Sequence, residues 1–73
     1  MKMTLKDIVC RTHPSNLITV INYLNDEVLI ESDTPDRILA FFDSELANLR
    51  EYLVYKVDVG KTHHDLVLYV CPH

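Results

Sequence analysis

The sequence predicts an α+β domain with a four-stranded, mainly antiparallel sheet and one helix packed on it. The prediction rests on a strong helix start signal in the middle of the chain and on a pair of strand-like segments on each side of it. With a short N-terminal helix, the expected order is helix, strand, strand, helix, strand, strand. A helix on a sheet forms two layers around one core, which is the usual construction of a small domain.

Length and composition fit one domain over residues 1–73. A domain this small buries only about 60% of the surface of its extended chain, so a partner subunit would add stability. Apolar residues make up 48% of the chain, which argues against disorder, and no apolar run reaches membrane-spanning length. The N-terminus lacks the apolar segment of a secretion signal, so we expect a cytoplasmic protein with reduced Cys10 and Cys71.

The first part of the chain predicts a short helix and a hairpin. Thr4 and Asp7 have the spacing of a capping box and open a helix that ends before Pro14, because the residue before proline avoids the helical conformation. Residues 17–24 fit a helix by apolar spacing and a strand by their β-branched content. Asn25-Asp26 is typical of a two-residue hairpin turn and residues 27–32 of a second strand, which favours the strand for 17–24.

The central segment predicts one amphipathic helix over residues 35–50, about four turns long. Thr34 can cap it, Pro35 suits the first helical position, and Asp36 places a carboxylate at the positive end of the helix dipole. Apolar side chains recur at spacings of three and four residues and form a stripe that should face the sheet: Ile38, Leu39, Phe42, Leu46, Leu49 and Leu53.

Residues 52–59 and 65–71 alternate as two further strands, joined by a polar connection. Alternation places Tyr55, Val57 and Val59 on one face of the first of them. The side of the sheet away from the main helix should carry Leu29, Val67 and Tyr69, with Tyr23 or Tyr55. Only the short N-terminal helix is available to cover that side, which leaves room for a dimer or partner interface.

Negative charge is concentrated in residues 26–45. This segment holds seven carboxylates against Arg37 alone, a local charge of −6 in a chain whose net charge is −4. Clustered carboxylates argue against direct binding to nucleic acid phosphates. They form either a solvated surface or a face that meets a basic partner groove. The residues are Asp26, Glu27, Glu31, Asp33, Asp36, Asp43 and Glu45.

The outer face of the predicted central helix is a second candidate surface. Ala40, Ser44 and Ala47 project opposite the apolar stripe, with Phe41 at its edge. Small residues permit close approach of another surface, and Phe41 could anchor it. The alternative is that alanine stands there as a good helix former.

Cysteine and histidine do not predict a metal site. Cys10 and His13 have a ligand-like spacing, but His63 and His64 lie near a loop about 20 Å along the strand from Cys71 and His73. Ser15 and Ser44 have no evident base, and no glycine-rich phosphate loop is present. We therefore expect no enzyme, no cofactor and no metal ligands.

One resemblance covers most of the chain. Its pieces are Thr4-Leu5-Lys6-Asp7-Ile8, His13-Pro14-Ser15, Ile18-Thr19-Val20, the acidic helix over 35–50, and Leu66-Val67-Leu68-Tyr69-Val70. In architecture and spacing this series resembles small uncharacterised open reading frames carried by prophages and conjugative elements of Gram-positive bacteria. The resemblance implies a dispensable accessory role and contributes no catalytic motif.

The sequence thus predicts a non-enzymatic protein-interaction module of mobile-element origin, acting as a homodimer or on a protein partner, without membrane contact. The expected face is the acidic segment with Phe41 and the small residues of the helix. One alternative is an acidic inhibitor of a host nucleic-acid-binding defence enzyme, of the anti-CRISPR or anti-restriction type. A second alternative is a small module stabilised by a structural metal.

Overall fold

The computed structural model describes residues 3–44, 47–60 and 65–72. Its elements, in chain order, are α1 (Leu5–Arg11), β1 (Leu17–Asn22), β2 (Val28–Asp33), α2 (Pro35–Phe42), the 3-10 helix η1 (Ala47–Glu51), β3 (Leu53–Val59) and β4 (Asp65–Cys71). The strands form one sheet in the order β2-β1-β4-β3. The central pair β1 and β4 is parallel, and the two outer pairs are antiparallel. The predicted α+β class and its mainly antiparallel sheet are confirmed.

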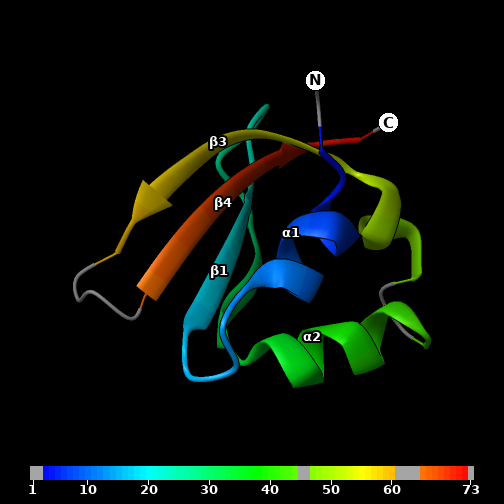
Figure 1. Ribbon diagram of the computed structural model, residues 1–73. Coiled ribbons are helices and arrows are strands. Elements are labelled where there is room, and N and C mark those ends of the chain that lie inside the picture. The colour runs from blue at the N-terminus through cyan, green and yellow to red at the C-terminus, as the bar shows by residue number, and fades with distance from the viewer. Residues whose placement is uncertain (1–2, 45–46, 61–64, 73) are drawn as a thin grey trace.

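Both helices lie on the same side of the sheet (Figure 1). Leu5 and Val9 of α1 are buried in the same core as Ile38 and Phe42 of α2. The expectation that the N-terminal helix covers the second side of the sheet is therefore wrong. No described helix lies on that second side, which we call the open face. The core is completed by Ile18, Val20, Ile30, Leu49, Leu68 and Val70.

The start of α1 follows the predicted capping box. The Thr4 hydroxyl accepts a hydrogen bond from the Asp7 N–H at 3.3 Å, and the Asp7 carboxylate accepts one from the Thr4 N–H at 3.4 Å. Two otherwise unsatisfied amides at the helix end are bonded in this way. The helix ends at Arg11, because Thr12 is extended and its N–H turns back to the Val9 carbonyl.

The central helix is shorter than predicted. It ends at Phe42, where the Asp43 N–H donates to the Ala40 carbonyl and the Ser44 N–H to the Phe41 carbonyl, contacts that tighten the last turn. The Ser44 hydroxyl donates to the Ala40 carbonyl as well. A serine hydroxyl competes with helical bonding in this way, and the single helix predicted over 35–50 is wrong. A separate 3-10 helix begins at Ala47.

The first hairpin turns over more residues than predicted. The Asn22 N–H donates to the Glu27 carbonyl, and the Asp26 N–H donates back to the Asn22 carbonyl. The side chains of Asn22 and Asn25 accept bonds from the amides two residues on, and Asp26 takes a left-handed φ of 58°. Because these asparagines stabilise a longer turn, the predicted two-residue turn at Asn25-Asp26 is wrong.

A bulge in β3 changes which side chains share a face. Val54 pairs with Val70 and Lys56 with Tyr69, so Tyr55 is an extra residue between them. Tyr55 lies near Tyr23 on the open face, whereas Val57 and Val59 pair with core-side residues of β4. The prediction that Tyr55 shares a face with Val57 and Val59 is wrong, because period-two alternation does not continue through a bulge.

Candidate functional site

Three tyrosines from separate segments meet on the open face. The Tyr23 ring centroid lies 5.4 Å from that of Tyr55 and 6.5 Å from that of Tyr69, the latter edge-on at 89°. The Lys56 ammonium lies 5.4 Å from the Tyr69 ring centroid. Tyr23 and Tyr55 are 50% and 52% exposed. We call the side chains of Tyr23, Tyr55 and Tyr69 the tyrosine patch. Their rings are arranged as favourable aromatic pairs, although Tyr23 and Tyr55 remain about half exposed to solvent.

Aliphatic side chains extend the tyrosine patch across the sheet. Val67 and Tyr69 alternate with the buried Leu68 and Val70, which places them on the open face as predicted. Val28 pairs with Ile21 at the β2 side and is 51% exposed. The predicted position of Leu29 on this face is wrong, since a register shift in β1 and β2 leaves it packed against the core.

A hollow of about 380 Å³ lies near the far end of the same face. The carboxylates of Glu31 and Asp65 line it, and the Thr19 hydroxyl accepts a hydrogen bond from the Ser32 N–H at 3.1 Å. Among the described lining residues there is neither a histidine nor a cysteine. The described lining of the hollow thus offers two acidic side chains and the hydroxyl groups of Thr19 and Ser32.

The predicted acidic face is spread over the molecule. Asp26 and Glu27 lie in the turn before β2, while Asp36 and Asp43 lie at opposite ends of α2. The six residues of β2 separate the turn from the start of α2 by about 17 Å, with Glu31 between them. All five side chains are exposed. Glu45 lies outside the described residues.

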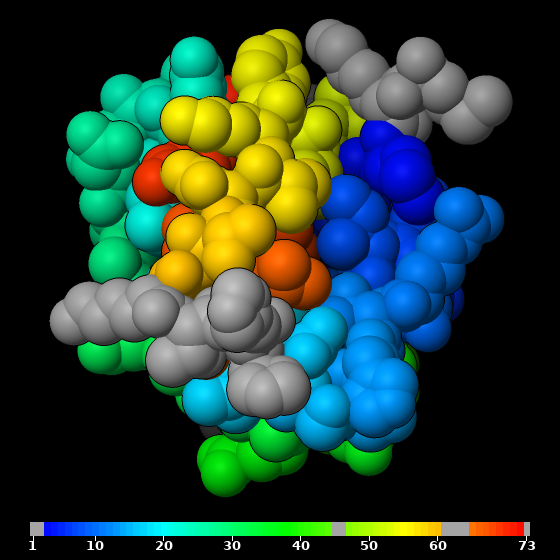
Figure 2. Space-filling view, turned by 60° about the vertical axis from the view of Figure 1, so that its left-hand side comes forward, coloured from blue at the N-terminus to red at the C-terminus, as the bar shows by residue number. Residues whose placement is uncertain are grey.

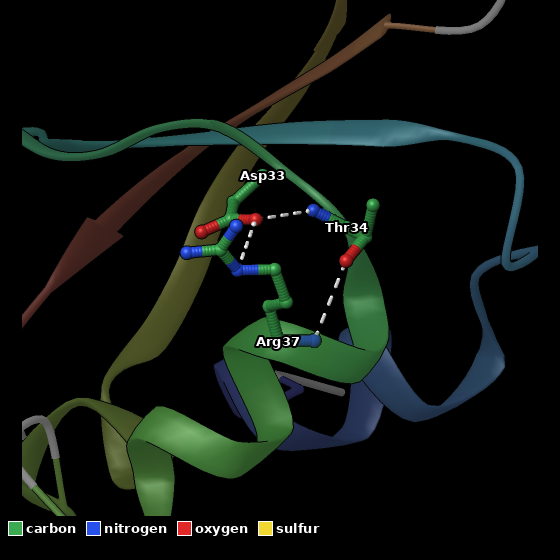
Figure 3. A network of polar contacts seen from close by, with 3 residues as sticks. All are labelled: Asp33, Thr34 and Arg37. Carbon is green, nitrogen blue, oxygen red and sulfur yellow. Dashed lines mark hydrogen bonds and ion pairs between the residues drawn. The ribbon is translucent and has the colours of Figure 1, made fainter.

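Asp33 has a structural role at the start of α2 (Figure 3). Its Oδ1 accepts a hydrogen bond from the Thr34 N–H at 2.9 Å and lies 3.4 Å from the Arg37 Nε. The Thr34 hydroxyl accepts the Arg37 N–H at 3.4 Å. Asp33 is thus paired locally, and the predicted acidic face loses one carboxylate to the helix cap.

The predicted helix face is not continuous. Ala40 lies on α2, Ser44 in the turn that follows Phe42, and Ala47 at the start of η1. Phe41 is half-buried, with the Arg37 guanidinium 6.0 Å from its ring centroid. Because the helix ends between them, these small residues do not form a stripe on one helix for close packing.

Among residues 3–44, 47–60 and 65–72, no three histidine, cysteine, aspartate or glutamate side chains form a group that could hold a metal ion. Both thiols are unpaired, Cys10 exposed and Cys71 buried. His63, His64 and His73 lie outside the described residues. None of the helices in the described part of the chain has the length and apolar content to cross a membrane.

The fold and these surfaces define an α+β protein with helices on one side of its sheet and an aromatic second side that no described helix covers. A scan against protein-family models and searches of curated proteins and solved structures found no match to this chain. We therefore infer its function from the surfaces of the molecule.

Proposed function

We propose that this chain is a small non-enzymatic protein-interaction module that binds a second copy of itself through the sheet side of the molecule. The observation that supports the proposal is the tyrosine patch on a face that no described helix covers. Val28 of β2 is exposed on the same face, and Val57 and Val59 are exposed on the neighbouring edge strand β3, where they pair with core-side residues of β4.

The composition of this side is that of an interface centre. The solvated face of a sheet normally carries polar residues, but here tyrosine, valine and isoleucine lie on the outward side, next to Lys56 and Asp58 of β3. Tyrosine is enriched at protein interfaces because a large ring can be buried while its hydroxyl still finds a partner. Apolar contact with a second copy on this side would add stability to a 73-residue domain, whose own core is small.

The helix side has weaker support as the contact surface. Phe41, its only predicted anchor, is half-buried beside Arg37, and the small residues around it lie on separate elements. A hot-spot side chain needs to be free to enter a partner pocket. We therefore place the self-contact on the sheet rather than on α2.

The acidic-inhibitor alternative also has weaker support. Asp33 is engaged by Thr34 and Arg37, and the remaining carboxylates extend from the first turn to the end of α2. Binding to a basic groove would weaken steeply as salt screens the charges, whereas apolar contact would not. The metal-stabilised alternative and the mobile-element origin stay predictions, testable by chelation and by genomic neighbourhood.

Sedimentation equilibrium of two matched variants tests the proposal. Tyr55→Asp places a charge in the tyrosine patch on strand β3, and Phe41→Asp places the same charge on the helix side. We expect the unmodified chain to dimerise with concentration, Tyr55→Asp to be monomeric, and Phe41→Asp to dimerise like the unmodified chain. Circular dichroism of each variant establishes that it is folded.

Two outcomes would overturn the proposal. A monomeric unmodified chain at every concentration would remove self-association altogether. Loss of the dimer in Phe41→Asp with retention in Tyr55→Asp would move the contact to the helix side.

A further inference from the structure

We propose that the dimer forms by edge pairing of β3 with β3 of a second copy, antiparallel and centred on Val57. This inference rests on the proposed self-association and places it at the β3 edge of the sheet, the strand that carries Tyr55 of the tyrosine patch. Figure 2 looks onto β3, whose yellow side chains lie at the surface between those of α1 and those of the β1–β2 hairpin.

The outer edge of β3 is partly occupied and partly open. β3 is the last strand of the sheet, and its start is covered by the N-terminal segment, where Thr4 bridges to Leu53 and the Val54 N–H donates to the Met3 carbonyl at 2.9 Å. Over residues 56–59, no strand among the described residues pairs with this edge. This stretch offers backbone groups to another chain.

Two observed hydrogen bonds fix which backbone groups point outward. The Gly60 N–H donates to the Asp65 carbonyl of β4, and the Val54 N–H points away from β4 toward Met3. In an antiparallel pair, the backbone groups of successive residues point alternately toward and away from the partner strand. Because Gly60 bonds β4, the N–H and C=O groups of Val59 and Val57 point outward, away from β4. Counting forward from Val54 through the bulge gives the same result. Val57 and Val59 therefore carry the backbone groups that a second strand would bond.

The opposite edge of the sheet is poorly suited to such pairing. The β1–β2 ladder has two register shifts, and Ser32 of β2 has a left-handed φ of 42°. Carboxylates of Glu27 and Glu31 accompany this edge. Bulges and charges are the features by which proteins block edge pairing. The pairing of β3 with β4, by contrast, has no register shift beyond Lys56.

Charge selects the register. Two copies related by a twofold axis bring β3 against itself in antiparallel orientation. With Val57 on the axis, Lys56 lies opposite Asp58 of the second copy, and this pair of opposite charges occurs twice. With Asp58 on the axis, the two Asp58 carboxylates would lie directly opposite each other, which is destabilising. The alternation of Lys56 and Asp58 on the open face makes the strand complementary to itself about Val57.

The pairing also accounts for the exposed valines. Val57 and Val59 are 54% and 63% exposed, although they pair with the core-side residues Leu68 and Leu66. On the axis, Val57 would pack against Val57 of the second copy. The four-stranded sheet would continue across the dimer, with both tyrosine patches on the same side.

Cysteine cross-linking tests the register, in full-length protein with Cys10→Ser to remove the exposed thiol. Directly opposite, hydrogen-bonded residues have Cα atoms about 5.5 Å apart, within the range that a disulfide spans. We expect Val57→Cys to form a covalent dimer under mild oxidation at least about tenfold faster than Val59→Cys, whose two copies would be about 13 Å apart. Preferential cross-linking of Asp58→Cys or Val59→Cys would overturn the register.

A charge swap supplies the second measurement. Asp58→Lys places two lysines opposite each other twice in the dimer, and we expect it to weaken dimerisation about tenfold. Adding Lys56→Asp should restore the affinity. A dimer that neither cross-links at Val57 nor responds to the swap refutes edge pairing while the proposed self-association stands. A monomeric unmodified chain refutes both.

Discussion

Gly60 and Asp65 approach so closely that position 60 has no room for a side chain. A Cβ on Gly60 would lie 2.5 Å from the Asp65 Cβ, and the Gly60 N–H donates to the Asp65 carbonyl at 2.9 Å. The contact joins the end of β3 to the start of β4, at the edge where we place the self-contact. The one glycine of the chain therefore permits the close approach of these two strand ends.

Replacing Gly60 tests this contact. Gly60→Ala should lower the free energy of unfolding by about 1–3 kcal/mol, because the Asp65 Cβ is held by the backbone and cannot move aside. Urea denaturation measures the loss. In an Asp65→Gly background the same substitution should cost much less; equal losses in both backgrounds would show that the contact is not the cause.

The adjacent phenylalanines should differ strongly. Phe42 is 2% exposed in the core, whereas Phe41 is half-buried beside Arg37. Phe42→Ala should cost about 3–5 kcal/mol, most of the stability of a small domain, and Phe41→Ala about 1 kcal/mol. Thermal unfolding followed by circular dichroism compares them. Similar losses would contradict the placement of the two rings.

The cap of α2 can be tested at Thr34. Its hydroxyl accepts the Arg37 N–H, so Thr34→Ala should lower the free energy of unfolding by about 1 kcal/mol. Thr34→Ser keeps the accepting oxygen and should lose only a small part of that. Chemical denaturation measures the free energy of unfolding of both variants. If Thr34→Ser were destabilised as much as Thr34→Ala, capping by the hydroxyl would be contradicted.

Asp26 carries a conformational cost in the first turn. Its φ of 58° lies in the left-handed region, which glycine adopts more readily than other residues. Asp26→Gly should therefore be more stable than Asp26→Ala by about 1 kcal/mol. Both variants remove the same charge, so the difference in urea midpoint reports the backbone. No difference would mean that the turn relaxes to another conformation.

Local signals predicted most of the fold. Thr4 and Asp7 form the capping box that their spacing indicates, Thr34 and Pro35 begin α2, and the four strands lie where the β-branched segments do. Such signals act between neighbouring residues, so they can be read from a linear sequence. The parallel pairing of β1 with β4 depends on contacts between distant segments and was not predicted.

The errors also have local causes. Asp43 and Ser44 end a helix whose apolar stripe continues past them, and the side chains of Asn22 and Asn25 bond the turn amides in a longer connection. Periodicity alone does not register this competition between side chain and backbone. Both features can be found by weighing Asp-Ser and Asn positions against the apolar pattern.

The candidate site was less predictable than the fold. Tyr69 and Val67 were expected on the uncovered side, but the meeting of Tyr23, Tyr55 and Tyr69 depends on a bulge and on the strand order. The open edge of β3 likewise follows from its place at the end of the sheet. Neither the tyrosine patch nor the open edge has a sequence motif. The alternation of Lys56 and Asp58 indicates a self-complementary strand only when β3 is known to be the edge of the sheet.

An NMR dilution series of the uniformly labelled, unmodified chain tests the central claim most directly, because it reports which residues change environment as copies separate. We predict concentration-dependent shifts for the amides of Val57, Val59 and Tyr69, with those of Ala40 and Phe41 unchanged. Shifts confined to α2, or a spectrum identical at every concentration, would contradict self-association through the sheet.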